Sequence, residues 1–331
     1  MLGRASMKLP RRKFLHLAAG AAALPAMPRI ASALDYPTRP VHLIATFAPG
    51  GVNDMSARVI GSYLSAHLGR QFVVDNRPGA GGNVGTEVVT KSAPDGYTLL
   101  MADISNAINP ALYDNIGFDF IRDTAPIGGV LRAPNVLVVH PSFPIRTVPD
   151  LIAYAKSNPG MVRAATAGIG SAPHVFGELF DSEAGIKMVQ VHYRGAGPAL
   201  IDMLGGTTEV MFPNMGSSIA YINAKRLIPL AVTCSTRSDV LPDVPALAEF
   251  LPGYEANYWS GIVAPKNTPA QLVNELNRAI NSALADPQII ARLRDIGATA
   301  IPGRPADFGK FIADETDKWG KVIRAAGIKV E

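Results

Sequence analysis

Short apolar runs alternate with segments of helical period from Tyr36 to the end of the chain. This alternation predicts parallel β-sheets flanked by helices, and therefore an α/β protein. The predicted strands cover residues 41–47, 72–74, 98–101, 136–139, 162–165, 188–191, 210–212, 228–233 and 261–264. The predicted helices cover residues 55–68, 84–91, 148–157, 175–183, 198–204, 219–224, 270–285, 287–296 and 306–325.

One supersecondary unit occurs twice along the chain. A strand, a glycine-containing turn and a helix follow one another over residues 41–68 and again over residues 162–183. The first turn reads FAPGGVND over residues 47–54, and the second reads TAGIGSAPH over residues 166–174. In the second turn, Ser171 is a predicted N-cap and Pro173 stands near the first helical position. The duplication indicates one such unit in each of two lobes.

Both turns have the chemistry of an anion site. Their glycines leave backbone N–H groups unshielded beside a helix N-terminus, where unpaired donors and the helix dipole favour a negative charge. Two such turns that face each other would hold one carboxylate from both sides. The alternative is that each is an ordinary strand-to-helix turn that needs glycine for its tight geometry.

Composition limits the classes of function. The chain has 331 residues, of which 48% are hydrophobic and 18% are charged, so it can build a large core or two lobes. Its formal charge is +4, but the first 34 residues hold six basic side chains and no acidic one. Without them, 25 basic residues face 27 acidic ones. Such a near-neutral domain gives no reason to expect binding to nucleic acid or to an anionic membrane.

The N-terminus has the features of an export signal. The sequence RRKFL at residues 11–15 precedes a mildly apolar stretch at residues 17–27 and the small-residue sequence ASA at residues 31–33. We therefore expect residues 1–33 to be removed by cleavage near Ala33. The paired arginines favour the twin-arginine route, with an ordinary secretory leader as the alternative. The apolar stretch is shorter than the ~20 residues of a membrane-spanning helix.

The single cysteine adds little to this interpretation. Cys234 is alone, so no disulfide can form within the chain, and its apolar surroundings predict a buried side chain. No cysteine stands at the predicted cleavage point, so a lipid-anchored N-terminus is not expected.

Other kinds of chemistry have weaker support. The glycine-rich stretch at residues 76–85 matches neither a dinucleotide fingerprint nor a P-loop, so Asn83 is expected either to line a cleft or to stand in a surface loop. Ser171 and His174 could form a hydrolase pair, but their context is not a nucleophile elbow, and His174 is expected to pack or cap its turn.

Metal binding has no support either, because His140, His174 and His192 are far apart in the sequence, without a carboxylate at ligand spacing. We therefore expect no cofactor, no metal and no catalysis. Four aromatic residues are expected either to line a cleft or to pack in the core: Tyr193, Tyr254, Tyr258 and Trp259.

Several ordered motifs carry a family resemblance. They read YPTRP at residues 36–40, the turn at 47–54, DNRPGAGGN at 75–83, PDGYTLL at 94–100, AINP at 107–110, LPDVP at 241–245 and WGKVI at 319–323. Together they resemble the Bug-type receptors of tripartite tricarboxylate transporters. The resemblance covers the chain from Tyr36 to residue 323.

The resemblance implies a two-lobed, type II-like periplasmic binding protein fold, with two mixed sheets flanked by helices and joined by crossing hinge strands. The expected boundaries are residues 34–137 for lobe 1, 138–257 for lobe 2, and 258–331 for a return to lobe 1 with C-terminal helices. It also implies a monomer in the periplasm that delivers a small organic carboxylate, aliphatic or aromatic, to the membrane subunits of a transporter.

In such receptors, the backbone amides of two strand-to-helix turns hold the ligand carboxylate. The residues expected at the ligand are Ala48, Gly50, Gly51, Asn53, Asp54, Asn83 and Ser105 from the first lobe, and Thr166, Ala167, Gly168, Gly170, Ser171, His174, Tyr193 and Asn214 from the second. Pro213 replaces an aspartate found in many relatives, and the second turn is poor in hydroxyl side chains. Both differences disfavour an amino-acid ligand such as aspartate. An exported hydrolase and a receptor for a membrane sensor kinase are the alternatives.

Overall fold

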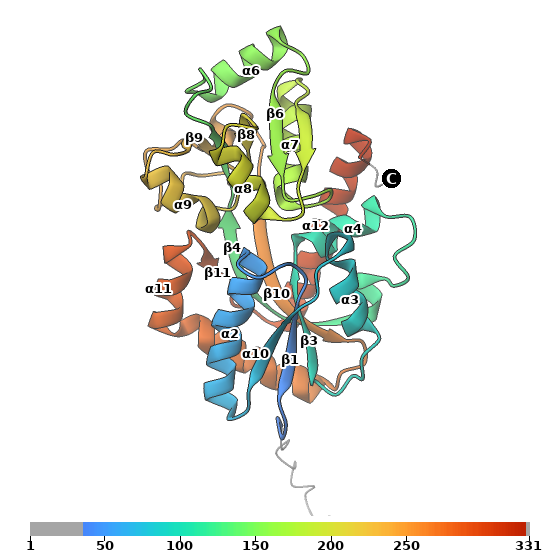
Figure 1. Cartoon of the computed structure of the whole chain (residues 1–331). Coiled ribbons are helices and arrows are strands. Elements are labelled where there is room, and N and C mark those ends of the chain that lie inside the picture. The colour runs from blue at the N-terminus through green and yellow to red at the C-terminus, as the bar shows by residue number, and fades with distance from the viewer. Residues whose placement is uncertain (1–35, 329–331) are drawn as a thin grey trace, which may run out of the picture. The chain divides into compact units, whose positions relative to one another are not determined.

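Two mixed β-sheets organise the residues that the structure, a computed structural model, describes, which are 36–328 (Figure 1). Both sheets belong to the unit Pro37–Glu331, and the predicted export signal lies outside the described residues. The first sheet has the strand order β11-β4-β10-β3-β1-β2, and the second has the order β7-β6-β8-β5-β9. The strands are β1 (Val41–Ala45), β2 (Phe72–Asn76), β3 (Thr98–Asp103), β4 (Thr124–Pro134), β5 (Val136–Val139), β6 (Arg163–Thr166), β7 (Val189–His192), β8 (Val210–Met211), β9 (Ile228–Val232), β10 (Asn257–Pro265) and β11 (Thr299–Ala300).

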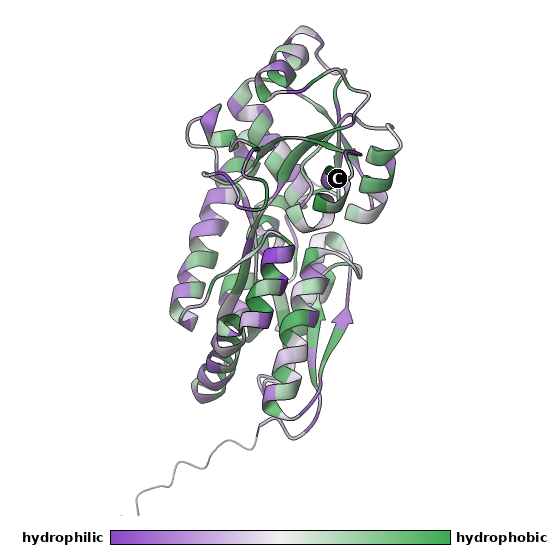
Figure 2. Cartoon of the chain, turned by 90° about the vertical axis from the view of Figure 1, so that its left-hand side faces the viewer, coloured by the Kyte–Doolittle hydropathy of each residue, from purple (hydrophilic) through white to green (hydrophobic). Residues whose placement is uncertain are grey.

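Helices cover both sheets. They are α2 (Val52–Leu68), the short helix η1 (Ala80–Gly82), α3 (Asn83–Thr90), α4 (Ile104–Leu112), α5 (Phe120–Asp123), α6 (Val148–Ser157), α7 (Ala172–Ala184), α8 (Ala196–Leu204), α9 (Met215–Asn223), η2 (Leu247–Glu249), α10 (Ala270–Ala285), α11 (Pro287–Asp295) and α12 (Pro305–Ala326). In Figure 2 the helices carry hydrophilic and hydrophobic residues along the same coil, as expected of helices with one face on a core.

Most predicted elements are confirmed, with shifted ends. Helix α2 begins at Val52 rather than at residue 55, because Gly51 is its N-cap. The predictions missed the helices α4 and α5 and the strands β4 and β11. The predicted burial of Cys234 is wrong, since this side chain is partly exposed and its thiol donates to the carbonyl of Thr236.

The segments of the chain that pass between the two sheets lie side by side. Strand β4 ends at Pro134 in the first sheet, and β5 begins at Val136 in the second, so only Asn135 separates them. The backbone N–H of Asn135 donates to the hydroxyl of Thr233, and the N–H of Thr233 donates to the carbonyl of Asn135, each at 2.9 Å. Strand β10 then returns to the first sheet and pairs antiparallel with β4 along its length. Two mixed sheets joined by crossing strands are the arrangement that the resemblance implied.

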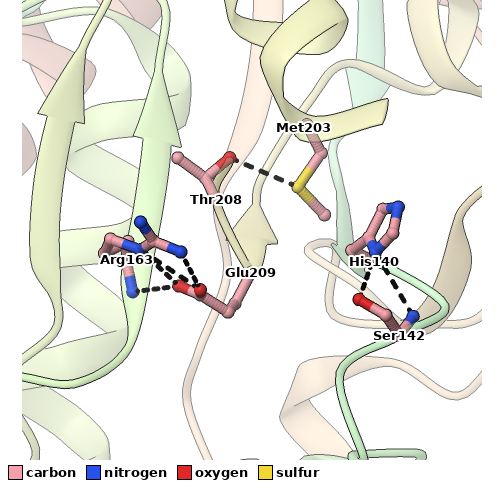
Figure 3. A network of polar contacts seen from close by, with 6 residues as sticks. All are labelled: His140, Ser142, Arg163, Met203, Thr208 and Glu209. Carbon is pink, nitrogen blue, oxygen red and sulfur yellow. Dashed lines mark hydrogen bonds and ion pairs between the residues drawn. The ribbon is translucent and has the colours of Figure 1, made fainter. Parts of the chain in front are cut away.

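A polar network fixes the amino-terminal ends of β6 and β8 (Figure 3). Arg163 forms an ion pair with Glu209, and its backbone N–H donates to the same carboxylate at 2.8 Å. Nearby, the hydroxyl of Thr208 contacts the sulfur of Met203 at 3.6 Å. Since α7 follows β6 and α9 follows β8, the turns that lead into these helices lie at the opposite, carboxyl end of the two parallel strands.

Helix α12 packs against elements of both sheets. It lies on α4 and β4 of the first lobe and also contacts α7 of the second. The ring of Trp319 stacks on that of Phe176 from α7, with the ring centroids 5.3 Å apart. The indole N–H groups of Trp259 and Trp319 both donate to the same carboxylate oxygen of Glu315, at 3.0 and 2.9 Å. The buried face of α12 therefore connects the hinge strand β10 with the second lobe.

Candidate ligand-binding site

The first turn lies at the carboxyl edge of the first sheet. Strands β1, β2 and β3 are parallel neighbours, so the segments that follow them share this edge. These segments are the turn at 47–51, the glycine turn of η1 and the start of α4. In open α/β sheets, this is the edge at which ligands bind.

Two buried side chains shape the first turn from within. The side-chain oxygen of Asn53 accepts from the N–H of Thr46 at 3.0 Å, and its nitrogen donates to the carbonyl of Met101 at 2.9 Å. The carboxylate of Asp54 accepts from the N–H of Gly50 at 2.9 Å and from Asn76 at 3.0 Å. Both side chains thus hydrogen-bond within the protein, to the turn and to the neighbouring strands, and their direct contact with a ligand stays a prediction.

The charge on Asp54 is stabilised locally. Burial alone would raise the pKa of this carboxyl, but hydrogen bonds from Arg58, Gly50 and Asn76 outweigh burial, so the pKa lies below its usual range. By contrast, Ala48 and Gly50 are exposed at the tip of the turn, and Gly51 is partly exposed. The backbone at the tip is therefore the accessible part of the turn.

The second turn is fixed by its own side chains. The hydroxyl of Ser171 donates to the carbonyl of Gly168 at 2.6 Å, and the ring atom Nδ1 of His174 accepts from the N–H of Gly170 at 3.1 Å. Gly168 and Gly170 have φ angles of 120° and 76°, which favour glycine. The N–H of Gly168 donates to the hydroxyl of Thr166 at 3.2 Å, and Ala167 accepts from the N–H of Gly195 at 3.2 Å. Ser171 is the N-cap of α7, as predicted.

The helices that follow the two turns begin without a side-chain cap. Neither Gly51 before α2 nor Ser171 before α7 accepts from the first helical turn through its side chain. Thr147 caps α6 and Asp286 caps α11 with such a bond, whereas α3, α8, α9 and α10 also begin without one. The N–H groups at the start of α2 therefore have no acceptor from a capping side chain. At the start of α7, Pro173 has no N–H and the N–H of His174 donates to the carbonyl of Ser171, which leaves the N–H of Ala172 as the donor without a capping side chain.

Helix α4 connects the two turns. Its N-cap Asp103 accepts from the side chain of Asn53 at 3.1 Å, on the side of the first turn. At its other end, a Cβ atom on Gly170 would stand 2.4 Å from Leu112 and 3.6 Å from the side-chain oxygen of Asn109. The second turn thus lies directly on the last turns of α4. The sequence interpretation placed Ser105 of α4 at the ligand but did not predict the helix itself.

The remaining predicted residues lie around this helix and in the second lobe. Asn83 bonds Asn109 through its side chain at 2.7 Å, and the N–H of Ser105 donates to Asp103 at 2.9 Å. Burial and a hydrogen bond with Asp202 raise the pKa of Tyr193 to about 12, so its hydroxyl is used within the second lobe. These placements leave their roles at a ligand as predictions.

Asn214 lies at the crossing between the lobes. Its side chain donates to that of Asn135 at 2.8 Å, beside the point where β4 passes into β5. Three of the four aromatic residues singled out in the sequence, Tyr254, Tyr258 and Trp259, are buried and pack in the core.

Two buried polar residues beside the turns were not among the site residues predicted from the sequence. Asp103 is 1% exposed, and burial raises its pKa to about 6 despite hydrogen bonds from Ser105, Tyr258 and Asn53. Asn109 is 1% exposed and reaches both Asn83 and the carbonyl of Gly81. The sequence D-x-x-N at residues 103–106 forms a capping box and could have revealed the start of α4.

The histidines are closer together than their spacing in the sequence suggested. The rings of His174 and His192 meet edge to face, 4.8 Å apart. His192 ends β7, and His174 lies at the start of α7, which follows the neighbouring parallel strand β6. Burial lowers the pKa of His174 to about 4, and the neighbouring His192 adds to this effect. A cavity of about 290 Å³ lies beside these rings, between α7, β7 and the last turn of α12. No cluster of three or more metal-ligating side chains occurs among residues 36–328.

The arrangement of Ser171 and His174 does not form a nucleophile and base. The hydroxyl of Ser171 donates to a carbonyl, and Nδ1 of His174 is occupied by the Gly170 N–H. Activation of a serine needs a hydrogen bond to the base, and the described residues contain none between these two.

Comparison with known families decides the identity of this fold. The model of the tripartite tricarboxylate transporter family receptor matches residues 56–328. The chain belongs to this family. Two curated relatives of this receptor are protein BugT of Bordetella pertussis, 38% identical over 91% of this chain and 93% of the relative, and an uncharacterised-family protein of a Pseudomonas species, 36% identical over 87% and 86%.

Solved structures agree with the receptor fold. An adipate-bound protein of R. palustris superposes with a TM-score of 0.85 at 35% identity, covering 89% of this receptor and all of that chain. The periplasmic binding protein BugD superposes with a TM-score of 0.83 at 32% identity, over 89% and 100%. The malate-bound MatC of Rhodopseudomonas palustris superposes with a TM-score of 0.81 at 28% identity, over 87% and 100%. The resemblance to Bug-type receptors seen in the sequence is confirmed.

Proposed function

We propose that this receptor captures a small organic carboxylate between the turns at 47–54 and 166–174. The observation that carries the proposal is the pair of uncapped helix N-termini, one in each lobe, behind glycine turns. Each charged hydrogen bond contributes about 1.5–3 kcal/mol, so a few backbone donors and two helix dipoles are sufficient for micromolar binding. The adipate and malate held by two structural neighbours support a carboxylate as the ligand class.

The proposal includes the following placement and partners. The receptor is exported, with cleavage near Ala33, and acts as a monomer in the periplasm. It delivers its ligand to the membrane subunits of a tripartite transporter. In the proposed domain division, lobe 1 ends near residue 137, lobe 2 ends near residue 257, and the rest of the chain returns to lobe 1. No helix among residues 36–328 is long and apolar enough to cross a bilayer.

We also propose that the protein is not an enzyme. The hydrolase alternative needs Ser171 to be activated by His174, and the hydrogen bonds of both side chains oppose this. Esterase turnover that disappears in Ser171→Ala would overturn this part of the proposal. A sensor-kinase receptor would bind the same ligand, so binding alone does not separate it from the transporter role.

The test is a thermal-shift screen against mono- and dicarboxylates. A ligand at 100 times its dissociation constant stabilises the folded state by ~2.7 kcal/mol. The decisive variant is Gly51→Val, because Gly51 has a φ of −80° and a Cβ atom there would meet only the Ala48 carbonyl at 3.8 Å. This variant should fold normally and lose the ligand-induced shift.

The matched control is Gly303→Val. Gly303 also has open space, with the nearest side-chain atom 4.0 Å from an added Cβ, but it precedes α12, away from both turns. The control should keep the full shift. A shift that survives Gly51→Val would place the ligand elsewhere, and the absence of a shift with every carboxylate would overturn the proposed ligand class.

A further inference from the structure

Three buried polar atoms without hydrogen-bond partners in the described residues surround the glycine turn of η1. They are the hydroxyl of Thr46, the side-chain nitrogen of Asn83 and the side-chain oxygen of Asn109. The three residues are 1%, 6% and 1% exposed. A buried polar atom without a partner is rare in folded proteins and costs free energy, so its retention calls for a ligand or another explanation.

These atoms lie on the same small region of lobe 1. A Cβ atom on Gly82 would stand 3.5 Å from the hydroxyl of Thr46, and one on Gly81 would stand 3.2 Å from the side-chain oxygen of Asn109. Gly81 and Gly82 have φ angles of 62° and 96°, so the turn needs glycine and brings bare backbone against the three side chains. Figure 1 shows α3, which bears Asn83, and α4, which bears Asn109, next to each other beside the sheet, and Thr46 directly follows β1 of that sheet.

Donor and acceptor roles in this cluster are fixed by one carbonyl. The carbonyl oxygen of Gly81 can only accept, so the side-chain atom of Asn109 at 2.9 Å from it is the NH₂ group. The same NH₂ group donates to Asn83 at 2.7 Å, so the atom of Asn83 that faces it is the oxygen. Asn83 therefore presents a free donor, Asn109 presents a free acceptor, and the hydroxyl of Thr46 can act as either.

The cluster also borders both carboxylate-binding turns. Thr46 directly precedes the first turn, and a Cβ on Gly82 would lie 3.8 Å from the ring of Phe47. On the other side, the free oxygen of Asn109 lies 3.6 Å from the position of a Cβ atom on Gly170, in the second turn. A ligand held by both turns therefore has the cluster within reach of its other end.

We propose that Thr46, Asn83 and Asn109 form a subsite for a second ligand group that both donates and accepts hydrogen bonds, such as a hydroxyl. The inference rests on the proposed carboxylate-binding function and narrows its ligand to hydroxy acids. A second carboxylate has no donor for the oxygen of Asn109, and a methyl group would leave all three atoms unpaired. A site that hydrogen-bonds a hydroxyl discriminates strongly against an analogue without it.

The test compares acids that differ only at the far end. The probes are hexanoate, its ω-hydroxy and ω-amino derivatives and adipate, with the corresponding butyrate and propionate series, each titrated by calorimetry. In the series whose chain length spans from the two turns to the subsite, the hydroxy acid should bind at least about tenfold more tightly than the acid with a terminal methyl group and the diacid. Equal affinities within every series, or a preference for the diacid, would overturn the inference.

Two variants separate the subsite from the rest of the site. Thr46→Val keeps the shape of the side chain and removes a hydroxyl that has no partner among residues 36–328, so the variant should fold. It should weaken the preference for the ligand that carries a hydroxyl. Asn83→Asp keeps the acceptor for Asn109 and turns the free donor into an acceptor. This variant should shift the preference toward the ω-amino acid, and an unchanged order of affinities would contradict the assignment.

The control is Asn281→Asp, since the amide of Asn281 lies in α10 and is bonded to Gly303 and Asn277. It should leave the order of affinities as in the wild type. If carboxylates bind without any preference for the hydroxyl, only this inference fails. If no probe of any series binds, the proposed carboxylate function fails with it.

Discussion

The backbone N–H of Gly170 donates to Nδ1 of His174, 3.1 Å away, and this bond closes the turn that enters α7. The His174 ring is 4% exposed. Burial lowers its pKa from 6.5 to about 4, with further contributions from His192 and Lys187. The ring is therefore neutral at neutral pH, which is the state in which Nδ1 can accept a hydrogen bond.

The neutral ring should make stability depend on pH. The unfolded chain takes up a proton on His174 near pH 6.5 and the folded chain only near pH 4, so the unfolded state binds more protons in between. The contribution of the neutral His174 ring to the free energy of unfolding is fully present above pH 6.5. It should fall by up to about 3 kcal/mol as the pH decreases to 4. Urea unfolding of the wild type and of His174→Gln measures it. A stability difference between the two that is identical at pH 7 and pH 4 would contradict this origin.

Substitution of Gly170 should lower the free energy of unfolding more than substitution of Gly185, another glycine with a positive φ angle. Gly170 and Gly185, at the two ends of α7, have φ angles of 76° and 62°. A Cβ atom on Gly185 has nothing within 4 Å, whereas one on Gly170 would stand 2.4 Å from Leu112 of α4. Both alanine variants should lose about 1 kcal/mol from backbone strain. Gly170→Ala should lose about 1–3 kcal/mol more, from the clash with the other lobe.

The comparison is made by thermal unfolding without ligand and with a saturating carboxylate. Gly185→Ala should keep the ligand-induced shift, because its added methyl group points into open space. Gly170→Ala should lose most of the shift, since the second turn must move off α4. Equal losses of stability in the two variants would show that the contact with Leu112 carries no free energy.

The two turns were predictable because their signals are local. Glycine next to the start of an amphipathic helix identifies a strand-to-helix turn without knowledge of the rest of the fold, as at Gly51 and Gly170. Helix α4 was not predictable in this way. It contains Pro110, which normally ends a helix, and asparagines of low helix propensity, so its stability comes from packing against α12.

Strand β4 was missed for a related reason. It contains Gly128 and Gly129, which weaken a strand pattern. A Cβ atom on Gly129 would stand 2.8 Å from Ile301, and one on Gly128 would stand 3.0 Å from Asn277. These glycines are required by neighbours more than a hundred positions away in the sequence, and only the folded structure brings them together. The contact between Asn83 and Asn109 is hidden from the sequence for the same reason.

Substitution of Glu315 should lower the free energy of unfolding more than substitution of an exposed residue of α12. Its carboxylate accepts from the indole N–H groups of Trp259 and Trp319, at 3.0 and 2.9 Å, and both rings are 1% exposed or less. Glu315→Ala leaves two buried donors unpaired and should cost about 2–4 kcal/mol. Asp314→Ala, which removes only an exposed ion pair with Lys310, should change stability by less than about 0.5 kcal/mol. Similar urea midpoints for the two variants would refute the role of Glu315.

Asp181 should destabilise the fold as the pH rises from 4 to 7. It is 2% exposed; one carboxylate oxygen accepts from the N–H of Met188 at 2.8 Å, and the other has no hydrogen-bond partner among residues 36–328. Burial raises its pKa from 3.8 to about 7, and the Met188 bond and Lys187 offset only part of this, while Glu178 adds to it. The folded state thus binds more protons than the unfolded chain between pH 4 and 7, so stability falls as the pH rises through this range.

Asp181→Asn removes this titration and keeps the acceptor for Met188. The variant should match the wild type near pH 4 and exceed its stability by about 2–4 kcal/mol above pH 7. Urea unfolding at pH 4, 6 and 8 measures the difference, with Asp317→Asn on the exposed face of α12 as the control that should change little at any pH. A gain of the same size at all three pH values would mean that the substitution acts through packing, because only a proton that the folded state holds and the unfolded state releases makes the gain grow with pH.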